Sequence, residues 1–206
     1  MNLGSQKAAI ATTRPSNAYF TRRLTKSPIS RPGADTACLA SGILYKTLDN
    51  YSMKHIRYKF SVDPDVIKEH SIHIPVQIGY YVGAYLNDPN GWSKYGYFFE
   101  PVESGESVTI RLSSPSTIKK VCGLPDNLSC AELGGRYMYL NADRWFHGAS
   151  ASKLPLEQYR QYMVSHEIGH ILGHEHKKCP CKGCDAPIMM QQTKGIGECK
   201  PNTHVK

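Results

Sequence analysis

The chain has 206 residues, of which 40% are apolar, and a formal net charge of +8. This length suits one sizeable domain with a tail, and no apolar run reaches the length of a membrane span. Residues 1–34 hold six Lys or Arg and no acidic residue, so much of the excess charge belongs to that segment. No nucleic-acid-binding motif accompanies the charge, and we predict no specific nucleic-acid partner.

Residues 1–45 have the composition of a tail rather than of a folded domain. They are rich in Ser, Thr, Arg, Ala and Pro and lack the apolar core of a secretory signal peptide. We expect a disordered basic tail or a targeting or pro-segment, and its composition does not decide the compartment. Residues 46–206 would then form a single domain, which we expect to be monomeric.

The spacing of apolar residues predicts several elements in the first half of this domain. Alternation indicates strands and a period of 3.6 indicates helices. Asp63-Pro64 ends the first strand, Pro75 lies in the first turn of a helix, and Asn90-Gly91 marks a turn. The predicted elements are a strand at 56–62, a helix at 74–87, and strands at 97–102 and 108–112.

A β-hairpin is predicted around Gly134-Gly135. Segments 129–133 and 136–141 flank this dipeptide, and a two-residue Gly-Gly link is typical of a tight hairpin. We expect one arm to lie at the edge of the sheet. Residues 142–154 are predicted to form a loop, after which Pro155 opens a long helix.

Residues 166–176 read His-Glu-Ile-Gly-His-Ile-Leu-Gly-His-Glu-His, the pattern HExxHxxGxxH. His166 and His170 are four residues apart, so a helix projects both from one face. Gly173 accepts the left-handed conformation that ends helices, after which His176 can return as a third ligand. Three protein ligands leave one zinc position open, as in catalytic sites. We therefore predict one catalytic zinc ion.

Glu167 is the candidate general base, because its carboxylate lies beside the first ligand and can reach a water that the metal activates. His174 is an alternative third ligand if the helix continues past the glycine. Glu198 is the alternative in a thermolysin-like site, although no matching helix surrounds it. A solvated helix face is a further interpretation of HExxH, and the added third histidine argues against it.

Seven cysteines are present, and this usage in one domain predicts disulfides and an oxidising or extracellular compartment. Pairing of Cys122 with Cys130 would close a short loop. Pairing of Cys179 with Cys199 would brace the segment that follows the zinc motif. An odd count leaves one cysteine free, and Cys38 in the tail is the candidate.

The alternative for the last cysteines is a second, structural zinc. Its ligands would be Cys179, Cys181, Cys184 and Cys199. The spacing CxCxxC lacks the paired CxxC units of zinc ribbons, so it argues against this site.

Together these residues resemble the metzincin clan of zinc metallopeptidases. In that clan a turn containing methionine lies under the zinc ligands, and residues 186–193 look like that turn. Met189 occupies the methionine position, with Met190 as the alternative. Some metzincins have a tyrosine two residues later; here Gln191 stands there, so that role is not carried over.

A closer resemblance is to an uncharacterised bacterial family of metzincin-like peptidases. It covers roughly residues 50–202. Besides the zinc motif, the shared residues are Asn141, Arg144, Trp145, Tyr159, Arg160, Cys179, Ala186, Pro187, Met189, Gln191, Gln192, Thr193, Cys199, Pro201 and Asn202.

The resemblance implies an α+β fold. Its parts are a small twisted mixed sheet with an edge hairpin, a backing helix and a zinc helix, and a short irregular C-terminal subdomain with the methionine turn. It also implies a zinc-dependent endopeptidase whose protein or peptide substrate lies extended along the edge strand. Residues 186–194 would wall the specificity pocket. The candidate substrate-binding residues are Ser129, Cys130, Ala131, Glu132 and Leu133.

The alternative function is a non-catalytic metal-binding or interaction protein derived from a metallopeptidase. Glu167 argues against it, because a structural metal site needs no general base.

Overall fold

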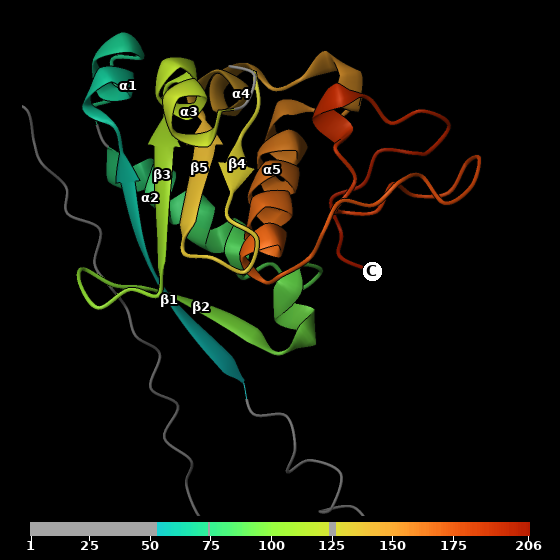
Figure 1. Cartoon of the computed structure of the whole chain (residues 1–206), viewed down its shortest axis with the longest axis horizontal. Coiled ribbons are helices and arrows are strands. Elements are labelled where there is room, and N and C mark those ends of the chain that lie inside the picture. The colour runs from blue at the N-terminus through green and yellow to red at the C-terminus, as the bar shows by residue number, and fades with distance from the viewer. Residues whose placement is uncertain (1–52, 74, 124–126) are drawn as a thin grey trace, which may run out of the picture. The chain divides into compact units, whose positions relative to one another are not determined.

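The computed structural model describes residues 53–73, 75–123 and 127–206. The predictions for residues 1–45, including Cys38, lie outside these ranges. Five strands form one sheet in the order β2-β1-β3-β5-β4 (Figure 1). Their bounds are β1 Lys54–Val62, β2 Tyr97–Pro101, β3 Val108–Ser113, β4 Cys130–Ala131 and β5 Tyr137–Asn141.

The sheet is mixed, as predicted. β1 pairs in parallel with β2 and β3, and β3 pairs in parallel with β5. Only the edge strand β4 runs antiparallel to its neighbour β5. Along β1 the buried Tyr58 alternates with exposed Arg57 and Lys59, so one face of the sheet carries the core and the other faces solvent.

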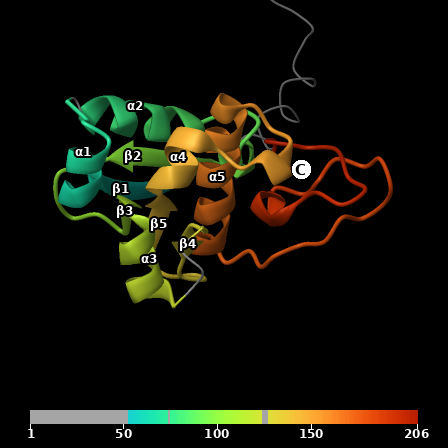
Figure 2. The ribbon, with the colours of Figure 1, turned by 90° about the horizontal axis from the view of Figure 1, so that it is seen from above.

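Two long helices cover the core face of the sheet. α2 spans Pro75–Leu86 and α5 spans Leu156–Ile171. They contact each other; α2 packs on β1 and β2, and α5 packs on β4 and β5 (Figure 2). Buried side chains of both helices and of the sheet form one cluster. The prediction that Pro155 opens a long helix holds, since Pro155 is the N-terminal capping position of α5.

Short helices lie where the sequence pattern was too brief to indicate them. α1 spans Pro64–Glu69, α3 spans Pro115–Cys122 and α4 spans Ala142–His147. Single 3-10 turns are η1 Trp92–Tyr95, η2 Ser150–Ser152 and η3 Gln192–Lys194.

The prediction of a loop over 142–154 was wrong for its first six residues, which form α4. The Asn141 side chain caps this helix by accepting a hydrogen bond from the Arg144 N–H at 3.1 Å, and Trp145 is buried in the core. A good N-cap and one buried anchor are enough to stabilise a helix of this length in a folded protein. Asn141, Arg144 and Trp145 therefore have a structural role.

The predicted hairpin is present, but the prediction that a two-residue Gly-Gly link joins its strands was wrong. β4 and β5 pair through Ala131 and Met138, and the turn is longer. The Glu132 carboxylate accepts hydrogen bonds from the backbone N–H groups of Arg136 and Tyr137, at 3.1 and 3.4 Å. Gly134, with φ of +64°, supplies the left-handed position. A side chain acting as turn cap thus replaces the tight type I′ link.

The segment after α5 is irregular, as predicted, and lies alongside α5 (Figure 1, red). Disulfides join Cys179 to Cys199 and Cys181 to Cys184, and a third joins Cys122 to Cys130. All six cysteines in the described part of the chain are thus paired. The four sulfurs considered for a second zinc are oxidised in pairs, which removes the thiolates that such a site requires.

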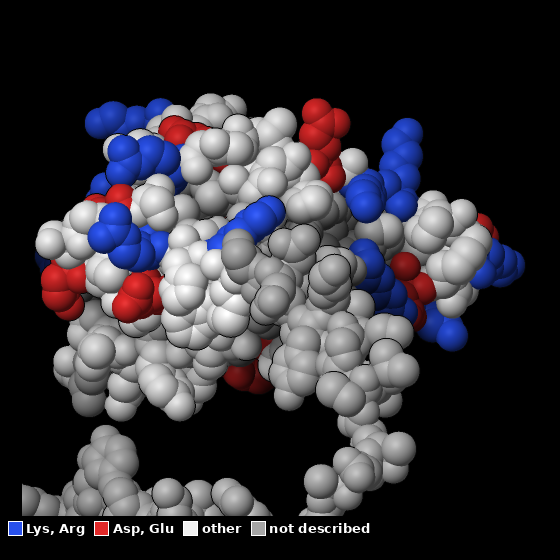
Figure 3. Space-filling model, turned by 90° about the horizontal axis from the view of Figure 1, so that it is seen from below, with Lys and Arg blue, Asp and Glu red and all other residues white. Residues whose placement is uncertain are grey.

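The described surface shows no single basic patch on the face seen from below. There, the visible Lys and Arg residues are interspersed with Asp and Glu (Figure 3). In the same ranges of the chain, no helix has the length and apolar character needed to cross a membrane.

Candidate metal centre and cleft

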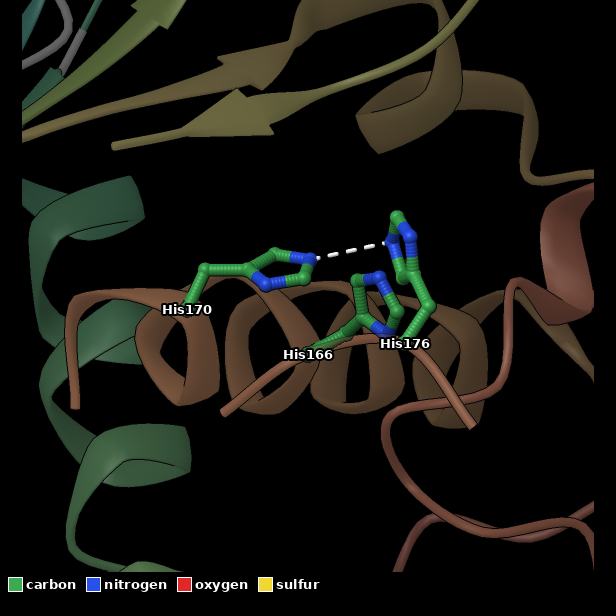
Figure 4. Close-up of side chains that lie close together, drawn as sticks. All are labelled: His166, His170 and His176. Carbon is green, nitrogen blue, oxygen red and sulfur yellow. Dashed lines mark hydrogen bonds between the residues drawn. The ribbon is translucent and has the colours of Figure 1, made fainter. Parts of the chain in front are cut away.

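Three histidine rings converge beside α5. His166 and His170 project from the helix, and His176 reaches back from the segment that follows it (Figure 4). One ring nitrogen of each lies within 4.8 Å of the others, and the Nε2 atoms of His170 and His176 are 3.1 Å apart. Zinc–nitrogen bonds of about 2.1 Å in a tetrahedron place ligand nitrogens roughly 3.4 Å apart. The cluster therefore fits a zinc ion.

Backbone carbonyl groups orient two of these rings. His166 Nδ1 donates to the Ile188 carbonyl oxygen, and His170 Nδ1 donates to the His174 carbonyl oxygen, both at 2.8 Å. Because a carbonyl oxygen only accepts, Nδ1 carries the proton in each ring and Nε2 carries the lone pair. This is the tautomer that a metal ligand needs, and the same bonds fix the ring orientation.

The chain leaves the helix at Gly173, whose φ is +89°. The N–H groups of Gly173 and His174 donate to the carbonyls of His170 and Gly169, each at 2.9 Å. These bonds close the last helical turn and reverse the chain, which brings His176 to the cluster.

His174 does not join the cluster. Its ring stacks on Trp92 with centroids 4.4 Å apart, and only its backbone carbonyl serves the site, through His170. The geometry therefore favours His176 over His174 as the third ligand.

Burial dominates the electrostatics of the site. It lowers the pKa of His166 to about 3 and also lowers the pKa values of His170 and His176. Burial likewise raises the pKa of Glu167 to about 8. The Glu167 side chain is 6% exposed, and within the described ranges no hydrogen-bond donor or cation pairs with its carboxylate. Neutral imidazoles and an unpaired carboxyl group thus share one cavity.

A cleft of about 530 Å³ opens over the histidines and Glu167. On one side it is bounded by the end of the hairpin, where Ser129, Cys130, Ala131 and Leu133 line it; the opposite side includes Gln191, Thr193 and Lys194. Of the candidate substrate-binding residues, only Glu132 is absent from the lining, because it caps the turn. The free edge of β4 therefore borders the cleft.

Met189 lies under the histidines. It is 2% exposed and contacts Gly169 of α5, between the two helix histidines. The Met190 N–H donates to the Pro187 carbonyl at 2.9 Å, closing a turn, and the Lys177 N–H donates to the Met189 carbonyl at 3.0 Å. The structure thus places Met189, rather than Met190, against the helix.

Two residues that support the site were missed in the sequence. The Tyr162 hydroxyl donates to the Met190 carbonyl at 2.9 Å and accepts from the Gln192 N–H at 2.8 Å, which ties α5 to the methionine turn. Tyr162 precedes His166 by four residues, so helix periodicity could have identified it. Trp92 donates from its indole nitrogen to the Ser165 carbonyl at 2.8 Å, and nothing in its local sequence indicated this contact.

Gln192 and Asn202, two of the residues that carry the resemblance to the metzincin-like family, hold the C-terminal segment together by hydrogen bonds. The Gln192 side chain donates to the Asn202 carbonyl at 2.8 Å and accepts from the Asn202 N–H at 3.1 Å. The Asn202 side chain donates to the Ala186 carbonyl at 2.9 Å. These residues hold the methionine turn in place and do not line the cleft.

Comparison with known proteins gives one family match. The family described as "Protein of unknown function (DUF3152)" matches residues 38–203. The comparison with curated proteins found no match.

Solved structures with low similarity were also found. The crystal structure of myroilysin is 18% identical with a TM-score of 0.37; the match covers 65% of this chain and 52% of that one, so this chain spans about half its length. The crystal structure of archaemetzincin (AmzA) from Archaeoglobus fulgidus, complexed with malonate, is 16% identical with a TM-score of 0.34; that match covers 71% of this chain and 96% of the other.

Proposed function

The chain belongs to the family of proteins of unknown function DUF3152, and we propose that this member is a zinc-dependent endopeptidase. His166, His170 and His176 would hold the metal, and Glu167 would act as general base. The observation that carries the proposal is the buried carboxyl group of Glu167, which has no hydrogen-bond or ion-pair partner among the described residues, beside three imidazoles that each bring one ring nitrogen within 4.8 Å of the others.

A bound zinc ion would supply Lewis-acid chemistry, lowering the pKa of a water to about 7 and polarising a carbonyl group. Glu167 would accept the water proton on a carboxylate oxygen and deliver it to the leaving amine nitrogen. The Ile188 and His174 carbonyls would keep two ligand rings oriented throughout.

The free edge of β4 would bind the substrate in an extended conformation. The backbone N–H and C=O groups of Ala131, which face away from β5, would pair with the substrate main chain, which makes binding largely independent of side-chain identity. Gln191, Thr193 and Lys194 on the opposite side of the cleft would contact the side chain next to the scissile bond. A mixed peptide library is therefore the appropriate first substrate.

The decisive experiment compares the full chain with Glu167→Gln, which keeps the side-chain shape and removes the base. Both proteins are loaded with zinc, assayed for metal content and incubated with the library, with mass spectrometry as the readout. We expect one zinc per chain in both, cleavage by the parent, and a loss of at least about 1000-fold in the variant. A chelator should abolish cleavage by the parent protein, and added zinc should restore it.

Two results would contradict the proposal. Zinc binding without cleavage of any library peptide would favour the non-catalytic metal-binding alternative. Cleavage that survives Glu167→Gln would remove Glu167 from the role of base.

The three disulfides support a further proposal, that the protein functions in an oxidising compartment. Alkylation of free thiols in protein taken from its natural source tests this. We expect the six cysteines of the described domain to be protected until a reductant is added; labelling of any of these six without reductant, located by mass spectrometry, would contradict the proposal.

A further inference from the structure

A second cavity lies on the far side of the methionine turn from the histidine cluster. Its volume is about 390 Å³, within the range of small-molecule sites. Aromatic rings of Trp92, Tyr95, Tyr97 and His174 contribute to its walls. Flat rings of this kind stack well on an aromatic ligand.

The charged residues that line this cavity are all cationic. Lys54, Lys177 and Lys206 line it, and no Asp or Glu does. Lys206 forms an ion pair with Asp185. The Lys54 amino group lies 5.1 Å from the centroid of the Tyr97 ring, and no carboxylate in the described ranges pairs with the side chain of Lys54 or Lys177. Two cations at the edge of an aromatic cavity are complementary to a ligand with a flat apolar body and an anionic head.

Two residues of this cavity also hold the histidine cluster. His174 lines the cavity, and its carbonyl oxygen accepts the hydrogen bond from His170. Ile188 lines it as well, and its carbonyl oxygen accepts the hydrogen bond from His166. A ligand that shifts these two residues would therefore shift the carbonyl groups that orient the rings of His166 and His170.

We propose that this cavity binds small aromatic carboxylates, whose rings pack against Tyr95, Tyr97 and His174 and whose carboxylate pairs with Lys54 and Lys177, and that this binding is coupled to metal binding. The carboxylate enters and leaves without a covalent step. This cavity shares no lining residue with the cleft, so ligand binding there is independent of the proposed peptidase function, whereas the coupling rests on the proposed zinc site. Coupling between two sites is reciprocal, so the metal changes ligand affinity by the factor by which the ligand changes metal affinity.

Calorimetric titration of the full chain with 2-naphthoate tests the proposal, with the uncharged 2-naphthalenemethanol as matched probe. We expect saturable 2-naphthoate binding at one site and at least tenfold weaker binding of the alcohol. Lys54→Gln and Lys177→Gln should each weaken 2-naphthoate binding several-fold. Lys120→Gln, which removes the same charge from exposed α3, should leave it unchanged.

Equal affinity for the two probes, or equal effects of the three lysine substitutions, would overturn the proposal. The coupling is measured by repeating the 2-naphthoate titration with zinc-loaded protein, for which we expect at least a threefold change in dissociation constant. Identical constants with and without zinc would overturn the coupling. The titration without zinc involves neither the metal nor Glu167, so ligand binding and the peptidase proposal fail separately. Zinc content, measured on the same protein, shows whether a missing coupling reflects an absent metal.

Discussion

Gly169 lies in α5 directly against the side chain of Met189, so closely that a Cβ atom at position 169 would overlap the methionine sulfur. Trp92 closes the other side, with its Cζ2 atom 2.8 Å from the same Cβ position. We predict that Gly169→Ala destabilises the protein by about 1–3 kcal/mol, because overpacking outweighs the roughly 1 kcal/mol gain in helix propensity. The melting temperature should fall, and zinc affinity with it.

The pair can be tested by a double-mutant cycle. Met189→Ala alone should destabilise by creating a cavity, but it makes room for the methyl group of Gly169→Ala. The losses in unfolding free energy caused by the two single substitutions should therefore sum to more than the loss in the double variant. Strict additivity would show that the two residues do not interact.

His176 and His174 can be separated by metal content. We predict that His176→Ala weakens zinc binding by more than the roughly 10–100-fold typical of losing a group that only orients a ligand. His174→Ala keeps the carbonyl that holds His170 and should retain one zinc per chain. Competition titration with a chromophoric chelator measures both affinities. The reverse order would assign the third ligand to His174.

The pKa of Glu167 predicts how the stability of the metal-free protein varies with pH. Burial raises this pKa from 4.5 to about 8, so between these values the unfolded chain releases a proton that the folded chain keeps. The contribution to stability is complete below pH 4.5 and is lost as pH rises to about 8. At about 1.4 kcal/mol per pKa unit, the loss is several kcal/mol.

Comparison with Glu167→Gln isolates this effect, because the histidines are common to both proteins. Urea unfolding at a series of pH values in the presence of a chelator should show the parent losing stability relative to the variant from pH 4.5 to 8. Zinc should reduce the difference, since a nearby cation favours the carboxylate. A difference that does not vary with pH would contradict the buried, protonated state of Glu167.

The disulfides should differ in their contributions. Cys179 and Cys199 are 20 residues apart, whereas Cys181 and Cys184 are 3 apart. The entropy of loop closure predicts about 3 kcal/mol for the first and about 2 for the second. Urea unfolding of Cys179→Ser/Cys199→Ser and Cys181→Ser/Cys184→Ser checks the order. Equal losses would show that loop length does not govern these two bonds.

Sequence patterns predicted the elements whose apolar spacing extends over several residues. The strand that ends before Asp63, the helix that follows Pro75 and the helix after Pro155 all formed near their predicted positions. α4 was missed because six residues are too few for periodicity, and its stability comes from the Asn141 cap and the buried Trp145. The hairpin turn was misjudged because Glu132 completes it with its side chain.

In the candidate site too, local spacing predicted some residues, whereas those that act through tertiary contacts were missed. The spacing of His166, Glu167 and His170 within one helix placed them together before any tertiary contact was known. The groups that orient the histidine rings are carbonyls, which every residue carries, so no residue type could identify Ile188 for this role. Trp92 reaches the site from 73 residues away, a contact that local spacing cannot indicate.

Trp92 is placed to serve as a fluorescence probe of folding. It is one of two tryptophans in the chain. Its indole donates a hydrogen bond to the Ser165 carbonyl of α5, lies close to Gly169 and stacks on the ring of His174. The other, Trp145, lies beneath the Arg160 guanidinium, 5.3 Å from its ring. Trp145→Phe would leave Trp92 as the single tryptophan among the 13 tyrosines. With excitation selective for tryptophan, its emission reports when the segment carrying His174 packs onto the helix during refolding.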